Sequence, residues 1–290
     1  KSIFMIPQML YEQGLVDVVF KKFGNVGFVN TSKNWDNWNT IVNSLQKTDD
    51  PIKIAMVGKY VTLADSYVSV NEALKHASAS IGKSVNIDWI DSETLNGNLK
   101  QLDNFDGVLV PGGFGTRGSE GIIDTATYAL EKNIPYLGIC FGFQLAAVAF
   151  GRKMCNLENA NSTEIVADTK NPIIDLLPEQ KDETDMGGSL RLGANEIKIN
   201  KDSLAHKIYS SDKIFKRHRH RYEFNTKYRE EFLKKGMIFS GESDDEKRME
   251  ILEIPSHKFF LGVQYHPEFN SRPGFPEDAF KTFVTVASQN

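Results

Sequence analysis

From Ile52 onward, short apolar runs alternate with segments that have the spacing of amphipathic helices, and this alternation constrains the fold more than any other feature. The apolar runs lie at 52–57, 85–90, 108–110 and 134–140, and the helical segments at 67–81, 125–132 and 143–150. Strands that are apolar throughout and alternate with helices are typical of a parallel sheet covered on both faces. Later strand-like segments lie at 190–199, 237–240, 249–254 and 259–265. We therefore predict an α/β fold: a mostly parallel central sheet with helices on both faces, plus additional partly antiparallel strands.

The first fifty residues have a different pattern. Helical spacing over 7–23 and again over 34–46 predicts two helices, and Lys47–Pro51 has the composition of a linker. We expect residues 1–50 to be separate from a main domain over 51–290. Because the sequence starts at Lys1 and not at a methionine, we also expect it to be part of a longer polypeptide.

Charge and hydropathy exclude several classes of function. The 290 residues carry a formal net charge of −4 at pH 7, which gives no global attraction to nucleic acid or to an anionic membrane. The apolar runs are far too short to cross a bilayer, and no signal segment opens the chain. The two cysteines, Cys140 and Cys155, are expected to be free thiols in a cytoplasmic protein.

One cysteine stands where a predicted strand meets a predicted helix. Cys140 ends the run 134–140, with Gly138 and Gly142 two residues to either side. Small residues at these positions permit the sharp turn that exposes the nucleophile of Gly-x-Ser-x-Gly hydrolases. The following helix N-terminus favours a thiolate and offers backbone N–H groups to an oxyanion. The alternative is a buried structural cysteine. Cys155 has no such context and is expected to be inert, in the core or at the surface.

A glycine-rich loop follows the preceding predicted strand. Pro111–Gly115 reads Pro-Gly-Gly-Phe-Gly, so few side chains would keep a ligand from the backbone amides. It lacks the spacing of a nucleotide phosphate loop. Ligands of parallel sheets bind beyond the carboxyl ends of the strands, so we expect this loop to neighbour Cys140. A glycine-rich turn without a ligand is the alternative.

A thiolate that expels ammonia needs a proton donor, because amide is a very poor leaving group. Of the six histidines, His266 is the best candidate, since it closes an apolar strand and is followed by Pro267 and Glu268. Pro267 favours an extended His266, and residues i and i+2 of an extended chain project to the same side. Glu268 could then orient the imidazole as a triad carboxylate does, although a solvated turn is also possible. The histidines that lack such partners are expected at the surface: His76, His206 and His257.

The one dense basic stretch is Lys-Arg-His-Arg-His-Arg at 216–221. In a strand, its alternation would place Arg217, Arg219 and Arg221 on one face, and one of them could bind the α-carboxylate of an amino acid with two hydrogen bonds. The alternatives are a solvated face or a nucleic-acid patch. The acidic total and the lack of other basic clusters argue against the nucleic-acid patch.

Six segments, in order, resemble signatures of the class I glutamine amidotransferases and, more closely, of the glutaminase domains of the CTP synthase family: Val110–Gly118, Gly138–Gln144, Asn156–Glu164, Gly187–Gly193, Arg217–Glu223 and Gly262–Phe269. The Gly-x-Cys-x-Gly and His-Pro-Glu segments alone would identify the wider class. The Glu-Asn-Ala-Asn-Ser-Thr-Glu and Arg-His-Arg-His-Arg-Tyr-Glu segments resemble CTP synthases specifically. The resemblance covers roughly 52–285, and residues 1–50 look like the end of that family's amidoligase domain and the interdomain linker.

The resemblance implies a triad of Cys140, His266 and Glu268 and a site for glutamine. The glutamine-binding residues that it implies are Gly113, Phe141, Gly142, Phe143, Gln144, Glu164 and Arg221. In it, Glu164 would bind the α-ammonium group of glutamine and Arg221 its α-carboxylate. The role of Glu164 rests on the resemblance alone. Phe141 and Phe143 stand where the family usually has Leu and Met, which could alter the shape of the pocket.

The function implied by the resemblance is hydrolysis of L-glutamine, with ammonia supplied to an amidoligase domain of the same polypeptide that aminates UTP to CTP. We expect no metal and no cofactor in this chain; ATP, Mg²⁺ and GTP would serve the full-length enzyme, a homotetramer. Nucleic acid and membrane are not expected partners. The alternatives are the glutaminase component of another amidotransferase, a γ-glutamyl hydrolase, or a catalytically silent assembly module.

Overall fold

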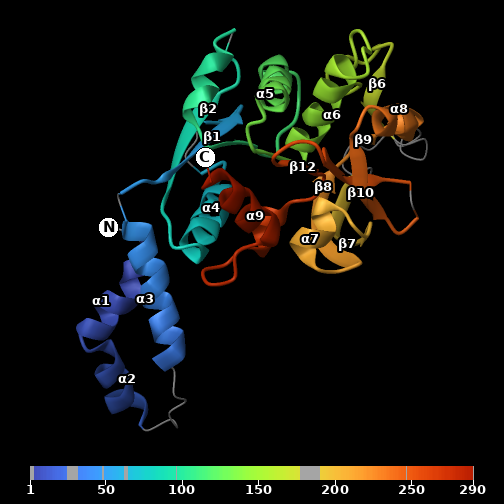
Figure 1. Cartoon of the computed structure of the whole chain (residues 1–290). Helices are drawn as coiled ribbons and strands as arrows, with labels where there is room; N and C mark the ends of the chain where they lie inside the picture. The colour runs from blue at the N-terminus through green and yellow to red at the C-terminus, as the bar shows by residue number, and fades with distance from the viewer. Residues whose placement is uncertain are drawn as a thin grey trace.

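The computed structural model describes residues 3–24, 32–47, 49–61, 65–95, 97–176, 190–245 and 247–289. Residues 25–31, between the two predicted N-terminal helices, and residues 187–189 of one sequence signature lie outside these ranges. Figure 1 shows a layered α/β body from which the N-terminal helices project.

The described helices and strands alternate along the main body. The helices are α1 (Ile6–Glu12), α2 (Leu15–Phe23), α3 (Ser32–Gln46), α4 (Val68–Ser80), α5 (Ser119–Lys132), α6 (Phe141–Lys153), α7 (Leu204–Tyr209), α8 (Arg229–Lys234) and α9 (Asp278–Ala287). The strands are β1 (Ile52–Gly58), β2 (Val85–Asp91), β3 (Gly107–Val110), β4 (Tyr136–Ile139), β5 (Asn161–Ser162), β6 (Pro172–Asp175), β7 (Arg191–Ile199), β8 (Lys213–His220), β9 (Glu223–Phe224), β10 (Ile238–Ser243), β11 (Met249–Glu253) and β12 (Phe260–Val263).

A nine-stranded sheet forms the centre, in the order β2-β1-β3-β4-β12-β11-β10-β7-β8. The strands from β2 to β12 pair in parallel. From β12 to β8 the pairing is antiparallel. The predicted α/β fold, with a parallel centre and antiparallel additions, is therefore confirmed. The short strands β5, β6 and β9 form a second sheet that the sequence patterns do not reveal.

Helices cover both faces of the large sheet because its strands are apolar on both sides. In β1, Ala55 and Val57 belong to the core beneath α5 and α6, whereas Ile54 and Met56 belong to the core beneath α4 and α9. Successive residues of a strand point to opposite faces, so one apolar run serves both cores. Figure 1 shows these two helix layers on opposite sides of the strands.

The strand order determines which loops meet. β4 lies between β3 and β12, with Leu137 paired in register with Leu109 on one side and Leu261 on the other. Because the three strands are parallel, their carboxyl ends lie at one edge of the sheet. The residues that follow them are the glycine-rich loop, Cys140 and the segment that leads to His266, so these three meet at this edge.

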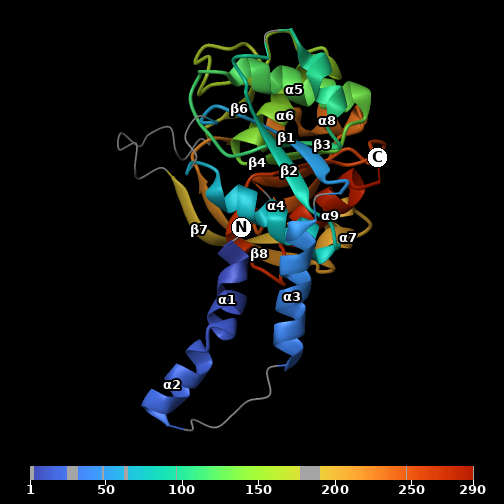
Figure 2. The same ribbon diagram turned by 90° about the vertical axis from the view of Figure 1, so that its left-hand side faces the viewer.

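The N-terminal helices extend away from the body, as Figures 1 and 2 show. The expected single helix over 7–23 is two helices, α1 and α2, separated at Gly14, which has the left-handed φ of +79°. Neither helix has a buried residue. The contact with the body runs through Phe4, whose ring lies 5.8 Å from that of His76, and through the buried Ile41 and Val42 of α3.

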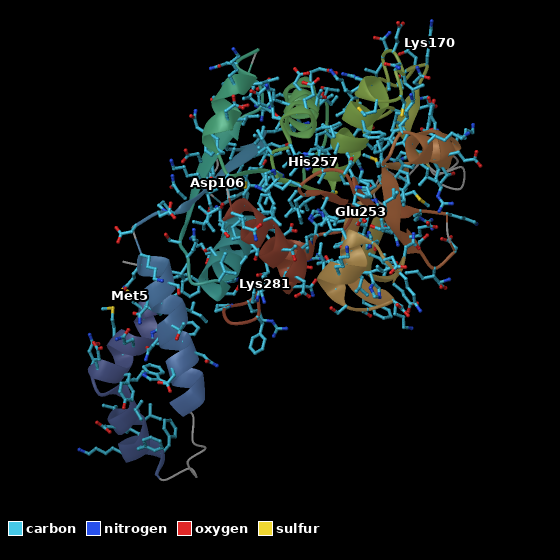
Figure 3. All side chains as sticks on the ribbon, viewed as in Figure 1. Met5, Asp106, Lys170, Glu253, His257 and Lys281 are labelled. Atoms are coloured by element: carbon cyan, nitrogen blue, oxygen red, sulfur yellow. The ribbon has the colours of Figure 1, made fainter. Side chains whose placement is uncertain are left out.

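Of the three histidines expected at the surface, one is buried and the other two are partly exposed. His76 is 7% exposed and bonds to Ser271 Oγ at 3.1 Å. His257, labelled in Figure 3, is half-buried and forms a hydrogen bond with the carbonyl oxygen of Ala129 at 3.0 Å. Helical spacing and loop context gave no sign of these partners, which are distant in sequence. His206 is partly exposed beside Asp212, as expected. No helix of the described chain is long and apolar enough to cross a membrane.

Candidate active site

Cys140 sits in a sharp turn between β4 and α6. It is the residue before the helix and has φ +51° and ψ −97°, a conformation rare for a residue with a side chain. Its flanking glycines make the turn possible. A Cβ on Gly142 would lie 2.3 Å from the carbonyl oxygen of Val110, and one on Gly138 would lie 2.7 Å from the backbone of Gly142. The predicted junction is therefore present, and both glycines are needed sterically.

The sulfur of Cys140 lies in a narrow, polar setting, and the residue is 5% exposed. Gln264 donates to Sγ at 3.7 Å from its Nε2, and Sγ lies 3.9 Å from the carbonyl oxygen of Arg219. The imidazole of His266 lies near enough that Cys140 raises its pKa. Cys140 thus has polar partners from β8 and from the segment after β12, which a buried structural cysteine would not need.

His266 is held between the sulfur and a carboxylate. Its Nδ1 lies 2.8 Å from Glu268 Oε1, and its backbone N–H donates to the carbonyl of Arg217 at 2.8 Å. Glu268 lies in a 3-10 helix, Pro267–Asn270, so the pair forms through a tight turn and not through the extended chain that we predicted. Burial lowers the pKa of His266, but the hydrogen bonds and negative charges of Cys140 and Glu268 outweigh it and raise the pKa to about 10.

The glycine-rich loop lies against both catalytic candidates. A Cβ on Gly112 would be 2.9 Å from Cε1 of His266 and 3.7 Å from Cβ of Cys140. A Cβ on Gly113 would be 3.5 Å from the ring of Phe141. The expected proximity of this loop and Cys140 is confirmed, and the absence of side chains lets the backbone approach the sulfur.

A buried lysine that the sequence patterns did not reveal supports this loop. Lys59, directly after β1, is 4% exposed; its Nζ donates to the carbonyls of Phe114, at 2.9 Å, and Gly115. The ammonium also lies 4.1 Å from the centroid of the Phe141 ring. Desolvation by burial lowers its pKa to about 8. The only signal in the sequence is a lysine directly after a fully apolar strand.

Glu164 reaches the same loop from the other side. Its Oε1 accepts from the backbone N–H of Gly115 at 2.7 Å, and burial raises the pKa of the carboxyl group. Burial raises the pKa of the Tyr222 phenol, the charge of Glu164 raises it further, and the charge of Arg221 lowers it, so both candidates for binding the charged ends of glutamine lie near enough to influence Tyr222. Gln144 Nε2 donates to the carbonyl of Tyr222 at 3.0 Å, which ties α6 to this region.

Two of the predicted glutamine-binding residues have packing contacts instead. Gly142 lies against the backbone of Val110, and the fully buried ring of Phe143 lies against Gly262, where a Cβ would be 3.2 Å from Cδ2. Their assignment to the glutamine site stays a prediction that only their backbone could fulfil. Phe141, by contrast, faces Gly113 and Lys59.

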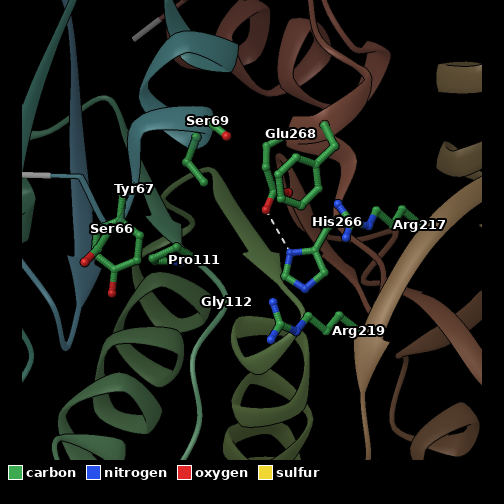
Figure 4. Close-up of a pocket in the computed structure, with 11 residues that line it drawn as sticks. Ser66, Tyr67, Ser69, Pro111, Gly112, Arg217, Arg219, His266 and Glu268 are labelled. Atoms are coloured by element: carbon green, nitrogen blue, oxygen red, sulfur yellow. Dashed lines mark hydrogen bonds and ion pairs between the residues drawn. The ribbon is translucent and has the colours of Figure 1, made fainter. Parts of the chain in front are cut away.

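A cavity of about 260 Å³ opens on the His266 side of the site. It is lined by Ser66, Tyr67, Ser69, Val70, Pro111, Gly112, Arg217, Arg219, His266, Glu268 and Phe269. Figure 4 shows Arg217 and Arg219 beside the His266 ring. As the alternation predicted, these two arginines share a face of β8, whereas Arg221 follows the strand end. The cavity therefore reaches the imidazole, whereas Cys140, Glu164 and Arg221 are not among its lining residues.

The opposite face of β8 carries a buried charged cluster. Ligand atoms of His218, His220 and Glu250 lie close enough to hold a metal ion. Glu250, however, already pairs with Arg191, and Glu223 lies 3.5 Å from Arg248 Nε. Burial, followed by the charge of Arg191, lowers the pKa of His218 to about 2 and that of His220 to about 3. Two carboxylates face two guanidiniums, so a divalent cation would add uncompensated buried charge and the donor set does not favour one.

Residues 62–286 match the family described as glutamine amidotransferase class-I. The chain belongs to this family. Among its relatives, a CTP synthase of Staphylococcus haemolyticus is 48% identical over 288 residues, which are 99% of this chain and 54% of the relative. A CTP synthase of Pyrococcus abyssi is 45% identical over 291 residues, 100% of this chain and 54% of the relative.

Among solved structures, the glutaminase domain of Trypanosoma brucei CTPS with bound acivicin is similar over 82% of this chain and 94% of that chain, with a TM-score of 0.78 and 37% identity. Within the amidotransferase family, the chain thus groups with the glutaminase domains of CTP synthases. It spans about half the length of the curated relatives that it matches.

Proposed function

We propose that this chain hydrolyses L-glutamine to glutamate and ammonia. The observation that supports this most directly is geometric: Cys140 and His266 follow two neighbouring parallel strands and both lie against Gly112, and Nδ1 of His266 lies 2.8 Å from Glu268 Oε1. The raised pKa of His266, to about 10, favours an imidazolium beside the Cys140 sulfur. A thiolate nucleophile next to a proton donor is what displacement of ammonia from an amide needs.

The steps follow from this geometry. The Cys140 thiolate attacks the carboxamide carbon, and a tetrahedral oxyanion forms. Since Nδ1 of His266 is bonded to Glu268, Nε2 is the nitrogen that donates a proton to the leaving amine, which departs as ammonia. His266 then takes a proton from water, the resulting hydroxide attacks the γ-glutamyl thioester, and glutamate leaves as the thiolate is restored.

The backbone around the sulfur supplies the oxyanion site. Phe141 is the first residue of α6, so its N–H has no acceptor within the helix, and Gly113 lies against its ring. These two amides would bind the oxyanion. Glu164 would bind the α-ammonium of glutamine and Arg221 its α-carboxylate, at the site around Tyr222.

The ammonia would serve a synthetase. The curated relatives are CTP synthases almost twice as long as this chain. We propose that an amidoligase domain of the same polypeptide uses ATP and Mg²⁺ to aminate UTP, with GTP as activator, in a cytoplasmic homotetramer. This chain would hold none of those nucleotides. Restored CTP formation on mixing with an amidoligase half would support this; hydrolysis of γ-glutamyl peptides instead of free glutamine would contradict it.

The first test is the release of glutamate from L-glutamine by Cys140→Ala. We expect activity to fall to background, with Cys155→Ala unchanged, because burial raises the pKa of the Cys155 thiol to about 11 and keeps it protonated. A glutamine-like diazoketone should add to Cys140 and not to Cys155, as mass spectrometry of digested protein would show. Substantial activity in Cys140→Ala would sink the triad assignment.

A further inference from the structure

Lys59 contacts both the glycine-rich loop and the start of α6, although it is not one of the predicted triad or glutamine-site residues. Its Nζ bonds the carbonyls of Phe114 and Gly115 and lies over the ring of Phe141. The Gly115 amide on the same stretch donates to Glu164. One buried ammonium therefore touches the glycine-rich loop and the first residue of the catalytic helix.

The loop needs such a support, since its own sequence does little to fix its shape. Three of the five residues in Pro111–Gly115 are glycines, and Gly115 has a left-handed φ of +77°. Glycine adopts many backbone conformations at similar energy, so the peptide planes of this loop can rotate. Two carbonyls that point to one cation restrict that rotation, and the amides of the same loop then point in fixed directions.

Lys59 is itself anchored. The guanidinium of Arg117 donates to the backbone carbonyl of Lys59 and pairs with Glu93 at 2.8 Å. The charged groups that act on the ammonium are Glu164, Arg117 and Glu93. Burial is the largest influence and lowers its pKa to about 8, so most of the lysine is charged at neutral pH. A charged group retained at this depth is costly unless it is bonded, as it is here.

We propose that Lys59 is a positioning residue for glutamine hydrolysis: its ammonium holds the Pro111–Gly115 loop so that the Gly113 amide faces the oxyanion of the tetrahedral intermediate. This inference rests on the proposed glutaminase function. Lys59 would not touch the substrate. Its effect belongs to the transition state, because the Gly113 amide binds an oxygen that becomes negative only as the thiolate attacks.

The test compares Lys59→Met with wild type in glutamine hydrolysis. Methionine keeps an unbranched side chain that can pack on Phe141 but cannot donate to the carbonyls. We expect kcat to fall by about 10- to 100-fold, since loss of one oxyanion donor costs ~10²–10³-fold, while KM changes by less than about threefold. Lys59→Arg, which keeps a charged donor, should recover part of kcat.

Two controls distinguish a loss of loop positioning from a general loss of stability or of Cys140 reactivity. Lys216→Met removes the other lysine that the described residues bury, which pairs with Glu277 at 2.7 Å, and should lower stability without the loss of kcat. Alkylation of Cys140 by iodoacetamide, which forms no oxyanion, should proceed at the wild-type rate in Lys59→Met. A folded Lys59→Met with wild-type kcat would overturn the inference and leave the glutaminase function intact. Wild-type activity that survives Cys140→Ala would instead overturn the proposed function.

Discussion

At the scale of single residues, the ionisation of His266 is the most direct consequence of the site. Histidine in an unfolded chain has a pKa near 6.5, and in the folded protein Cys140 and Glu268 raise it to about 10. The imidazolium therefore contributes stability that is fully present below pH 6.5 and is lost as the pH rises through about 10.

We expect the ring protons of His266 to titrate near pH 10 in an NMR experiment, and at a lower pH in Cys140→Ala and in Glu268→Gln, because each variant removes a negative partner. Titration of His266 near pH 6.5 in the wild-type protein would contradict the thiolate–imidazolium pair.

The sequence predicted functional residues whose backbone is defined by their neighbours in the chain. It did not predict residues whose contacts lie far away in the sequence. Cys140 and His266 were predicted because glycines and a proline beside them define their backbone. Lys59 was missed, since its partner Phe114 is 55 residues away and nothing near Lys59 indicates that contact. Gln264 was missed for the same reason, and Glu164 was found only through the resemblance to a known family.

At the scale of elements, the turn between β4 and α6 has no room for a side chain at Gly142. We expect Gly142→Ala to destabilise the protein by about 1–3 kcal/mol, a typical cost of overpacking, because its Cβ would meet a backbone oxygen at 2.3 Å. Chemical denaturation would measure the loss. Gly151→Ala in the same helix is the matched control: its Cβ would meet only side-chain atoms, at 3.3 Å, and equal losses in both variants would refute the steric argument.

Apolar runs predicted the core strands to within a few residues, because a strand covered on both faces needs apolar residues at every position. Short elements were not predictable in this way. β5, β6 and β9 are two to four residues long, and their pairing comes from distant segments. The helix predicted at 125–132 begins at Ser119, since its first turn follows Gly118 with no side-chain cap to mark it.

At the scale of the whole molecule, the three N-terminal helices are a small part of the chain and the α/β body is a much larger one. The boundary that we predicted near residue 50 stays a prediction. A chain that starts at residue 49 should fold and label at Cys140 with the diazoketone as the longer chain does, because α1 and α2 bury no residue. Loss of the Phe4 and Ile41 contacts should lower the Tm by about 2–4 °C for each kcal/mol of lost packing. Calorimetry would measure the Tm, and mass spectrometry the reaction of Cys140 with the diazoketone. A truncated chain in which Cys140 no longer reacts would show that the helices support the site.

The pairing of β4 with β12 has a consequence for how the protein is made. Gln264, two residues before the base, lies 124 residues beyond Cys140 in the chain. At a translation rate of roughly 5–20 residues per second, a ribosome needs on the order of 6–25 s to add that stretch. During that interval the growing polypeptide carries the Cys140 sulfur without His266. Under the proposed function, release of ammonia would have to wait for the segment after β12, and fragments from interrupted synthesis that lack it would be inactive.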